Sequence, residues 1–272
     1  MELTLVSAVI EFFVVVAVSL AAVLLNTIDA RGFLASATVG FAVVYGGGMP
    51  WFIVVGVFFI LGVAFTLYKY GYKKRIGGAQ GKGGARSWPN ILANGGLASI
   101  IAVANFFAPG YYPVALFLGS ISAAAADTAA TEIGLLSRGR PRLLTNLSRV
   151  VPPGTSGGVT LLGFVGAAFA SLVIGLMGAS LNLLPNPYVL LLVCLVGGVF
   201  GAAADSLIGA TLQRKGYCAV CQKPTEDVKH CGEKSKITGG LPYVENNVVN
   251  VLSTAAGACA AFLILVPLLP GV

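Results

Sequence analysis

The chain has 272 residues, of which 57% are hydrophobic and only 10% are charged, and its formal net charge is +7. A soluble domain usually carries about 25% charged residues. This composition therefore excludes an ordinary soluble protein and predicts an integral membrane protein.

Apolar runs long enough to cross a bilayer follow one another along the whole chain. The second run is short enough to be re-entrant, so we expect an all-α, polytopic transmembrane bundle of about 7–8 spans, in one integral membrane domain over residues 1–272. The predicted spans are residues 3–26, 33–48, 51–68, 91–107, 113–135, 157–181, 188–212 and 246–268.

The basic residues lie only in alternate connections. All 17 Lys and Arg residues occur at Arg31 and within residues 69–86, 138–149 and 214–236. By the positive-inside rule these four loops face the cytoplasm and both termini lie outside, in the plasma membrane of a prokaryote. Membrane orientation explains the positive charge, so we expect no nucleic-acid partner.

The tetrapeptide Ala-Ala-Ala-Asp occurs twice, at Ala124–Asp127 and Ala202–Asp205. A carboxylate inside a membrane span is expensive and usually marks an ion or substrate site. The predicted topology puts both motifs near the cytoplasmic ends of two spans that run in the same direction. Small alanines permit close helix packing, so we predict that the two aspartates share one site.

Other polar residues occur at the same depth in five spans. Each one alone could be a helix cap or an interhelical hydrogen bond, but a set on one face favours a polar site. Thr131 and Gly209 each follow an aspartate by four residues and therefore share its helix face. The other members are Asn90, Asn94, Glu132, Thr155, Ser156, Thr160, Gln213, Asn246 and Asn250.

Two cytoplasmic loops have the character of phosphate-binding segments. Residues 77–86 are rich in glycine and contain Lys82 and Arg86; the alternative is a flexible basic linker. Residues 151–160 contain two prolines that fix the start of the sixth span and glycines that expose its first N–H groups, which favours a phosphate. Carboxylates near such loops suggest Mg²⁺, held here by Asp127 and Asp205.

The segment 214–244 contains a Cys-x-x-Cys motif and an adjacent His-Cys pair. These residues are Cys218, Cys221, His230 and Cys231. Structural zinc, a disulfide and unmodified thiols are the three alternatives.

Several segments over residues 83–250 together resemble the membrane-protein family of the plant phytyl-phosphate kinase, which is distantly similar to polyprenol kinases and CDP-diacylglycerol synthases. The segments that carry this resemblance are 83–86 with Asn94, 126–134, 141–145, 151–160, 205–213 and 246–250.

The resemblance implies an Mg²⁺-dependent kinase that transfers a phosphate from a nucleoside triphosphate, preferably CTP, to an isoprenyl monophosphate such as phytyl or geranylgeranyl phosphate. Asp127 and Asp205 would hold the metal, with help from Glu132. The remaining residues expected to bind substrate are Lys82, Arg86, Asn90, Asn94, Thr131, Arg142, Thr145, Pro153, Gly154, Thr155, Ser156, Gly157, Gly158, Thr160, Ser206, Gly209, Gln213, Asn246 and Asn250.

Two rival functions stay open at this point. A cytidylyltransferase would make a CDP-activated lipid with the same residues, and an ion-coupled transporter would use Asp127 and Asp205 as ion sites. The sequence is also compatible with a homo-oligomer.

Overall fold

The computed structural model describes residues 2–79 and 81–268. In this part of the chain, seven helices are long and apolar enough to cross a membrane. The predicted transmembrane helix bundle is therefore confirmed. The helices are α1 (Glu2–Leu24), α2 (Gly32–Leu67), α3 (Tyr70–Arg75), α4 (Trp88–Phe107), α5 (Tyr111–Gly134), α6 (Leu161–Ser180), α7 (Pro187–Thr211) and α8 (Asn246–Leu268), with a 3₁₀ turn at Lys82–Gly84.

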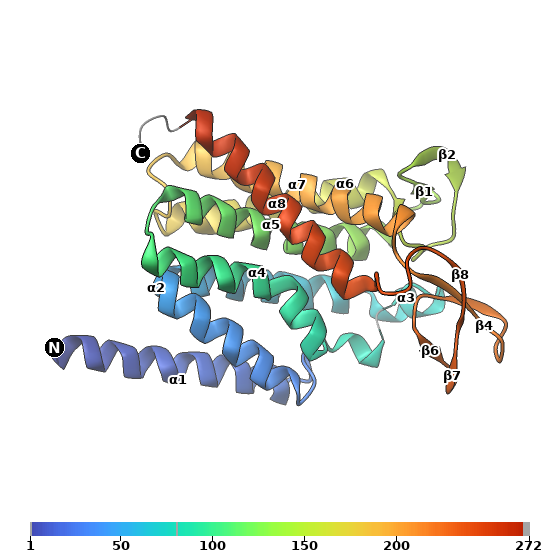
Figure 1. The fold of residues 1–272 in the computed structure, drawn as a ribbon, viewed down its shortest axis with the longest axis horizontal. Helices are drawn as coiled ribbons and strands as arrows, with labels where there is room; N and C mark the ends of the chain where they lie inside the picture. Colours follow the sequence, from blue (N-terminus) through green and yellow to red (C-terminus); the bar gives the residue numbers. More distant parts are fainter. Residues whose placement is uncertain (1, 80, 269–272) are drawn as a thin grey trace.

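Helix α2 is a helical hairpin that turns back at Gly48. This glycine has a φ of 69°, which helical residues do not adopt, and Pro50 follows it. A Cβ on Gly40 would lie 3.1 Å from a ring carbon of Phe52, although a straight helix would separate the two residues by about 18 Å. The predicted second and third spans are thus the two arms of α2, which run in opposite directions (Figure 1).

The hairpin puts all of the basic connections at one end of the bundle. Figure 1 shows the start of α1 and the end of α8 at one end, and α3 with the short strands at the other. This arrangement agrees with the alternation of charged and uncharged loops. Which end faces the cytoplasm remains a prediction from the charges.

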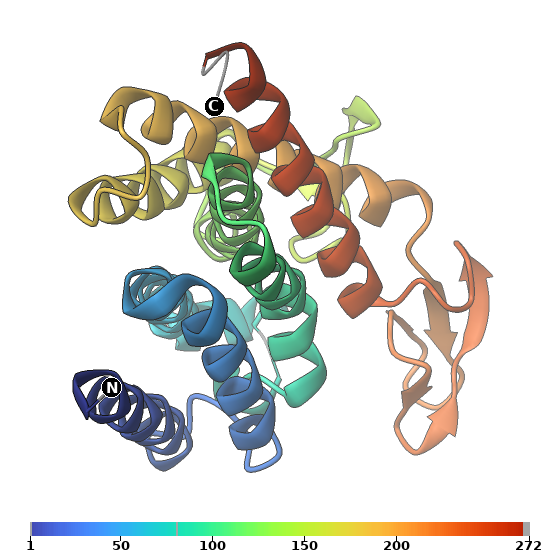
Figure 2. The same cartoon turned by 60° about the vertical axis from the view of Figure 1, so that its left-hand side comes forward.

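Helix α5 is the central helix and α1 is peripheral. In their most hydrophobic segments, 78% of α5 is buried but only 17% of α1. In Figure 2, α1 lies at the outer edge of the bundle, and the strands after α7 form a small lobe that projects from it. The alanine-rich sequence of α5 suits its position, because small side chains let neighbouring backbones approach closely.

Helices α5 and α7 pack in parallel with a constant register. A Cβ on Gly197 would lie 2.9 Å from the Cα of Gly119, and a Cβ on Gly201 would overlap the side chain of Ala123. Both pairs are offset by the same number of residues as the two Ala-Ala-Ala-Asp motifs. The register therefore carries the repeated motif of one helix alongside that of the other.

Helix α8 runs against this pair in the opposite direction. A Cβ on Gly257 would lie 2.8 Å from the carbonyl oxygen of Gly119 and 2.7 Å from that of Gly197. One glycine from each of α5, α7 and α8 thus meets the other two. Only glycine permits so close an approach of three backbones.

The polar connections contain short strands that the sequence did not predict. Helix α6 also begins at Leu161, where Thr160 caps it by accepting a hydrogen bond from the N–H of Gly163 at 3.0 Å. The prediction of a helix from residue 157 is therefore wrong, because residues 158–159 pair as a strand instead.

The strands are β1 (Arg142–Leu143), β2 (Asn146–Val150) and β3 (Gly158–Val159) in the order β2-β1-β3; β4 (Lys215–Cys218), β5 (Lys223–Thr225) and β8 (Lys236–Gly239) in the order β5-β4-β8; and the pair β6 (Lys229–His230) with β7 (Glu233–Lys234).

Candidate functional site

A polar pocket opens at the end of the bundle where the basic loops gather. It lies between α5, α7, the first turn of α8 and the segment that precedes α6. Many residues of the predicted site meet here, although they come from distant parts of the sequence. Those that line the pocket are Asp127, Thr131, Gly154, Thr155, Ser156, Gly157, Gly158, Thr160, Asp205, Ser206 and Asn246.

Asp127 and Asp205 lie side by side in this pocket. The parallel register of α5 and α7 places their carboxyl groups within hydrogen-bonding reach of each other. The hydroxyl of Ser253 lies beside Asp205, yet the buried Oδ2 atom of Asp205 accepts no hydrogen bond from a described residue. Two adjacent carboxylates favour a shared proton or a cation between them.

The segment before α6 is docked onto α7 through glycines. Gly157 has a φ of 77°, and a Cβ there would lie 2.5 Å from the Cβ of Ala210. Gly209 is equally restricted, since a Cβ would lie 2.6 Å from the hydroxyl of Ser156. That hydroxyl donates a hydrogen bond to the side-chain oxygen of Gln213. The pocket wall is therefore fixed by backbone approach and by this polar contact.

Glu226 is a third pocket carboxylate, which the sequence analysis missed. The amide Nε2 of Gln213 donates a hydrogen bond of 2.7 Å to its Oε2 atom. Burial raises the pKa of Glu226, the charge of Asp227 adds to that rise, and Lys215 opposes it. The signal in the sequence is an acidic pair within an otherwise basic segment.

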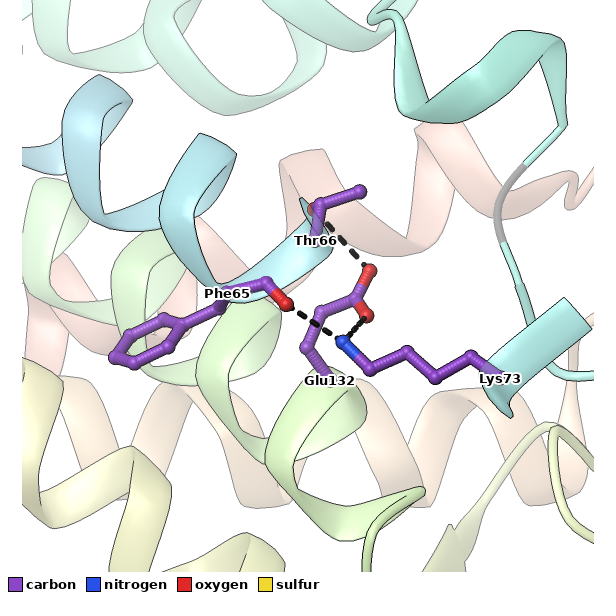
Figure 3. A network of polar contacts seen from close by, with 4 residues as sticks. All are labelled: Phe65, Thr66, Lys73 and Glu132. Atoms are coloured by element: carbon purple, nitrogen blue, oxygen red, sulfur yellow. Dashed lines mark hydrogen bonds and ion pairs between the residues drawn. The ribbon is translucent and has the colours of Figure 1, made fainter. Parts of the chain in front are cut away.

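Glu132 lies outside the pocket, contrary to the expectation that it helps to hold the metal. Its Oε2 accepts a hydrogen bond from Lys73 at 2.6 Å, while its Oε1 accepts one from Thr66 at 3.2 Å. Figure 3 shows both contacts. Lys73 also donates to the carbonyl of Phe65 at 2.6 Å. Five residues along a helix turn the side chain by about 140° from Asp127. Glu132 is thus a structural ion-pair partner.

Arg86, one of the predicted phosphate-binding cations, also lies outside the pocket. Arg86 is only 7% exposed and stacks over Phe58, with 5.4 Å between the guanidinium carbon and the ring centre. Burial lowers the pKa of Arg86, while the charges of Glu132 and Asp127 oppose this effect. No Lys or Arg among the described side chains lines the pocket. The side chain of Lys82 lies outside the described part of the structure.

The β1–β2 hairpin carries two further predicted residues away from the pocket. Arg142 donates a hydrogen bond of 2.6 Å to the carbonyl of Leu147, and Thr145 is exposed at the turn. Pro153 lines a neighbouring cleft that also contains Arg138 and Arg140.

The predicted asparagines lie on two helices, with Asn90 and Asn94 on α4 and Asn246 and Asn250 on α8. Asn94 donates to the carbonyl of Asn90 at 2.9 Å and lines an apolar cavity together with Arg86. Asn250 is buried on α8, one turn below Asn246. Only Asn246 of these amides lines the pocket.

These features define a polytopic membrane protein with an acidic pocket near one membrane face. The chain belongs to the family described as "Integral membrane protein DUF92", whose model matches residues 13–258. This result confirms the resemblance to the family that includes the plant phytyl-phosphate kinase.

Individual relatives come from archaea and plants. The chain is 34% identical to an uncharacterized membrane protein of Methanocaldococcus jannaschii over 70% of this chain and 76% of the relative. It is 30% identical to Protein PGR of Arabidopsis thaliana, over 72% and 75% of the two chains. It is 24% identical to the chloroplastic Protein VTE6 of the same plant, over 88% and 66%. No solved structure matches the chain.

Proposed function

We propose that this protein is an isoprenyl-phosphate kinase. It transfers the terminal phosphate of a nucleoside triphosphate, preferably CTP, to a lipid monophosphate such as phytyl or geranylgeranyl phosphate. The observation that carries the proposal is the convergence of Asp127 and Asp205 with residues 154–158 in one pocket. The relationship to VTE6 supports the lipid acceptor.

The residues of the pocket fit a hard divalent cation. Asp127 and Asp205 offer adjacent carboxylates, and the buried Oδ2 of Asp205 has no hydrogen-bond partner among the described residues. Mg²⁺ prefers oxygen ligands and commonly joins one or two carboxylates to substrate phosphates. Asp127 and Asp205 would hold Mg²⁺, which would neutralise phosphate charge during transfer.

The negative charge of the pocket also favours a bound divalent cation. Its described lining contains three carboxylates, from Asp127, Asp205 and Glu226, and no Lys or Arg. A triphosphate would be repelled by this lining unless a cation were bound with it. The acidic pocket thus favours a metal–nucleotide complex over a free nucleotide.

The rest of the lining is suited to positioning. The backbone around Gly154 and Gly157 adopts positive φ values and exposes polar groups to the pocket together with Thr155. Asn246 and Ser206 add an amide and a hydroxyl from the facing helices. Phosphoryl transfer depends mainly on positioning and charge neutralisation, and an acceptor phosphate needs no strong general base.

The direct test uses purified protein in lipid nanodiscs with Mg²⁺, phytyl phosphate and CTP. CTP labelled in the γ-phosphate should give a labelled lipid diphosphate. Asp127→Asn and Asp205→Asn should abolish most of the product, whereas Glu11→Gln, which changes a carboxylate on peripheral α1, should retain it. Full activity in both aspartate variants would overturn the assignment of the site.

The same assay separates the kinase from cytidylyl transfer. A cytidylyltransferase would place label from the α-phosphate of CTP in the lipid and release pyrophosphate. That result would replace the kinase proposal. Parallel reactions with ATP, GTP and UTP test the preference for CTP.

A further inference from the structure

Four potential metal ligands converge in the lobe between α7 and α8. The side-chain ligand atoms of Cys218, Cys221, His230 and Cys231 all lie within 4.8 Å of one another. Cys218 ends β4 and Cys221 follows in the β4–β5 turn, whereas His230 ends β6 and Cys231 begins the β6–β7 turn. Two hairpin turns thus contribute two ligands each.

The spacing of these atoms matches tetrahedral coordination. Nδ1 of His230 lies 3.5 Å from the sulfur of Cys221 and 3.3 Å from that of Cys231. A neutral imidazole has one N–H, so this nitrogen cannot donate to both sulfurs. Zinc bonds of about 2.3 Å to sulfur and 2.0–2.1 Å to nitrogen put these atoms about 3.6 Å apart in a tetrahedron.

The backbone of both turns is shaped to bring the ligands together. The thiol of Cys218 lies 3.7 Å from the carbonyl oxygen of His230, so the two turns contact each other at the cluster. Gln222 and Cys231 adopt φ values of 54° and 52°, which non-glycine residues rarely do. Adjacent residues of a strand face opposite sides. The turn at Cys231 breaks this alternation, so that Cys231 and His230 reach the same point.

We propose that Zn²⁺ is bound by the three thiolates and the imidazole Nδ1 of this cluster, and that it holds the lobe in place. The three thiols release their protons to solvent when the ion binds. Glu226 lies in the segment between the two hairpin turns and reaches the pocket beside α7. The metal would thereby fix a pocket carboxylate without contacting substrate. The zinc site itself does not depend on the kinase proposal.

Metal analysis of the full-length chain tests the zinc site. Protein purified in detergent under anaerobic, reducing conditions should contain one zinc ion per chain, as measured by inductively coupled plasma mass spectrometry. Cys221→Ser and His230→Ala should remove it. His230→Cys should retain it, because four cysteines also form a zinc site. Cys259→Ser, a matched change on α8, should retain it as well.

Four outcomes would overturn this site. Three of them are a chain without zinc after incubation with zinc chloride, a disulfide among the four residues in the anaerobically purified protein, and stoichiometric iron in place of zinc. Retention of zinc by both Cys221→Ser and His230→Ala would also overturn it.

Limited proteolysis tests the effect of the ion on the lobe. Trypsin can cut after Lys229, Lys234 and Lys236, which lie in the lobe. Removing the metal with a chelator should speed cleavage there by about tenfold or more, because local opening becomes easier. Restoring ZnCl₂ should reverse the change in the wild type but not in His230→Ala. Equal cleavage rates with and without zinc would overturn the proposed positioning role, whatever the protein catalyses.

Discussion

The two carboxylates near the end of α5 have opposite surroundings. Glu132 is 1% exposed, and both of its oxygens accept hydrogen bonds, from Lys73 and Thr66. Asp127 lies one and a half turns earlier and meets a second acid, Asp205, in an open pocket. The comparison teaches that a membrane carboxylate with a built-in cation serves the fold. A pair of carboxylates with no ion-pair partner among the described side chains is available to a ligand.

The largest effect should come from breaking the satisfied pair. Lys73→Met leaves Glu132 buried without its cation, which should destabilise the protein by about 3–5 kcal/mol. A lower midpoint of thermal unfolding in detergent would show this. The double variant Lys73→Met with Glu132→Leu should recover most of the loss, since no charge remains unpaired. A double variant as unstable as Lys73→Met alone would contradict this interpretation.

Changing the unsatisfied pair should affect activity without loss of stability. Asp205→Asn removes one of two adjacent charges, so the unfolding midpoint should stay the same or rise. The rate of phosphate transfer should fall about 10²–10³-fold, a loss typical of a removed electrostatic contact at a reacting centre. Initial rates and thermal unfolding of the same preparation check both parts. A fall in stability with a proportional loss of activity would assign Asp205 to the fold instead.

The wall of the pocket offers a smaller and purely steric test. Gly157→Ala places a methyl group against Ala210 at a positive φ, which should cost about 1–3 kcal/mol and open the wall. Gly96→Ala is the matched control, because a Cβ at Gly96 meets nothing within 4 Å. We expect a higher KM for the nucleotide in the first variant alone. Equal KM values in the two variants would show that the docking of this segment is unimportant.

Glu226 should give the smallest effect. Glu226→Gln keeps an oxygen for the hydrogen bond from Gln213 and removes one negative charge. Half-saturation should therefore need about fivefold more Mg²⁺, which corresponds to about 1 kcal/mol. Titration of the initial rate with Mg²⁺ measures this change.

The pH dependence of Glu226 provides the control. Because burial raises the pKa of this group above its value in the unfolded chain, its ionisation in the folded state is unfavourable. Its stabilising contribution is present below the unfolded pKa and is lost as pH rises through the folded pKa. The glutamine variant should thus be the more stable protein at neutral pH. A variant that is less stable there would contradict the assigned burial.

The periodic and compositional signals predicted the helices well. The fifth, seventh and eighth spans begin and end within two residues of α5, α7 and α8. The pairing of Asp127 with Asp205 was also predicted, because repeated small residues before each acid permit in-register packing. These features depend on local sequence and on one helix contact.

The surroundings of other site residues depend on the folded loops. No local signal in the sequence predicts that Lys73, six residues past the end of α2, contacts Glu132. The same holds for Glu226, which reaches the pocket from the cysteine-containing lobe. Arg142 was expected at the triphosphate but donates to Leu147 within its own hairpin. Short strands with few residues have weak signals, so their partners are set by the tertiary structure.

The meeting point of Gly119, Gly197 and Gly257 has a geometric consequence for the pocket. Asp127 and Asp205 each lie eight residues beyond their glycine, so both carboxylates stand about 12 Å along their helices from this point. The angle between α5 and α7 at the glycine contact therefore sets the separation of the two carboxylates. A methyl group added at this contact would change that angle, and the resulting displacement would be larger at the pocket than at the contact. The spacing of the two pocket carboxylates is thus determined in part near the middle of the three helices.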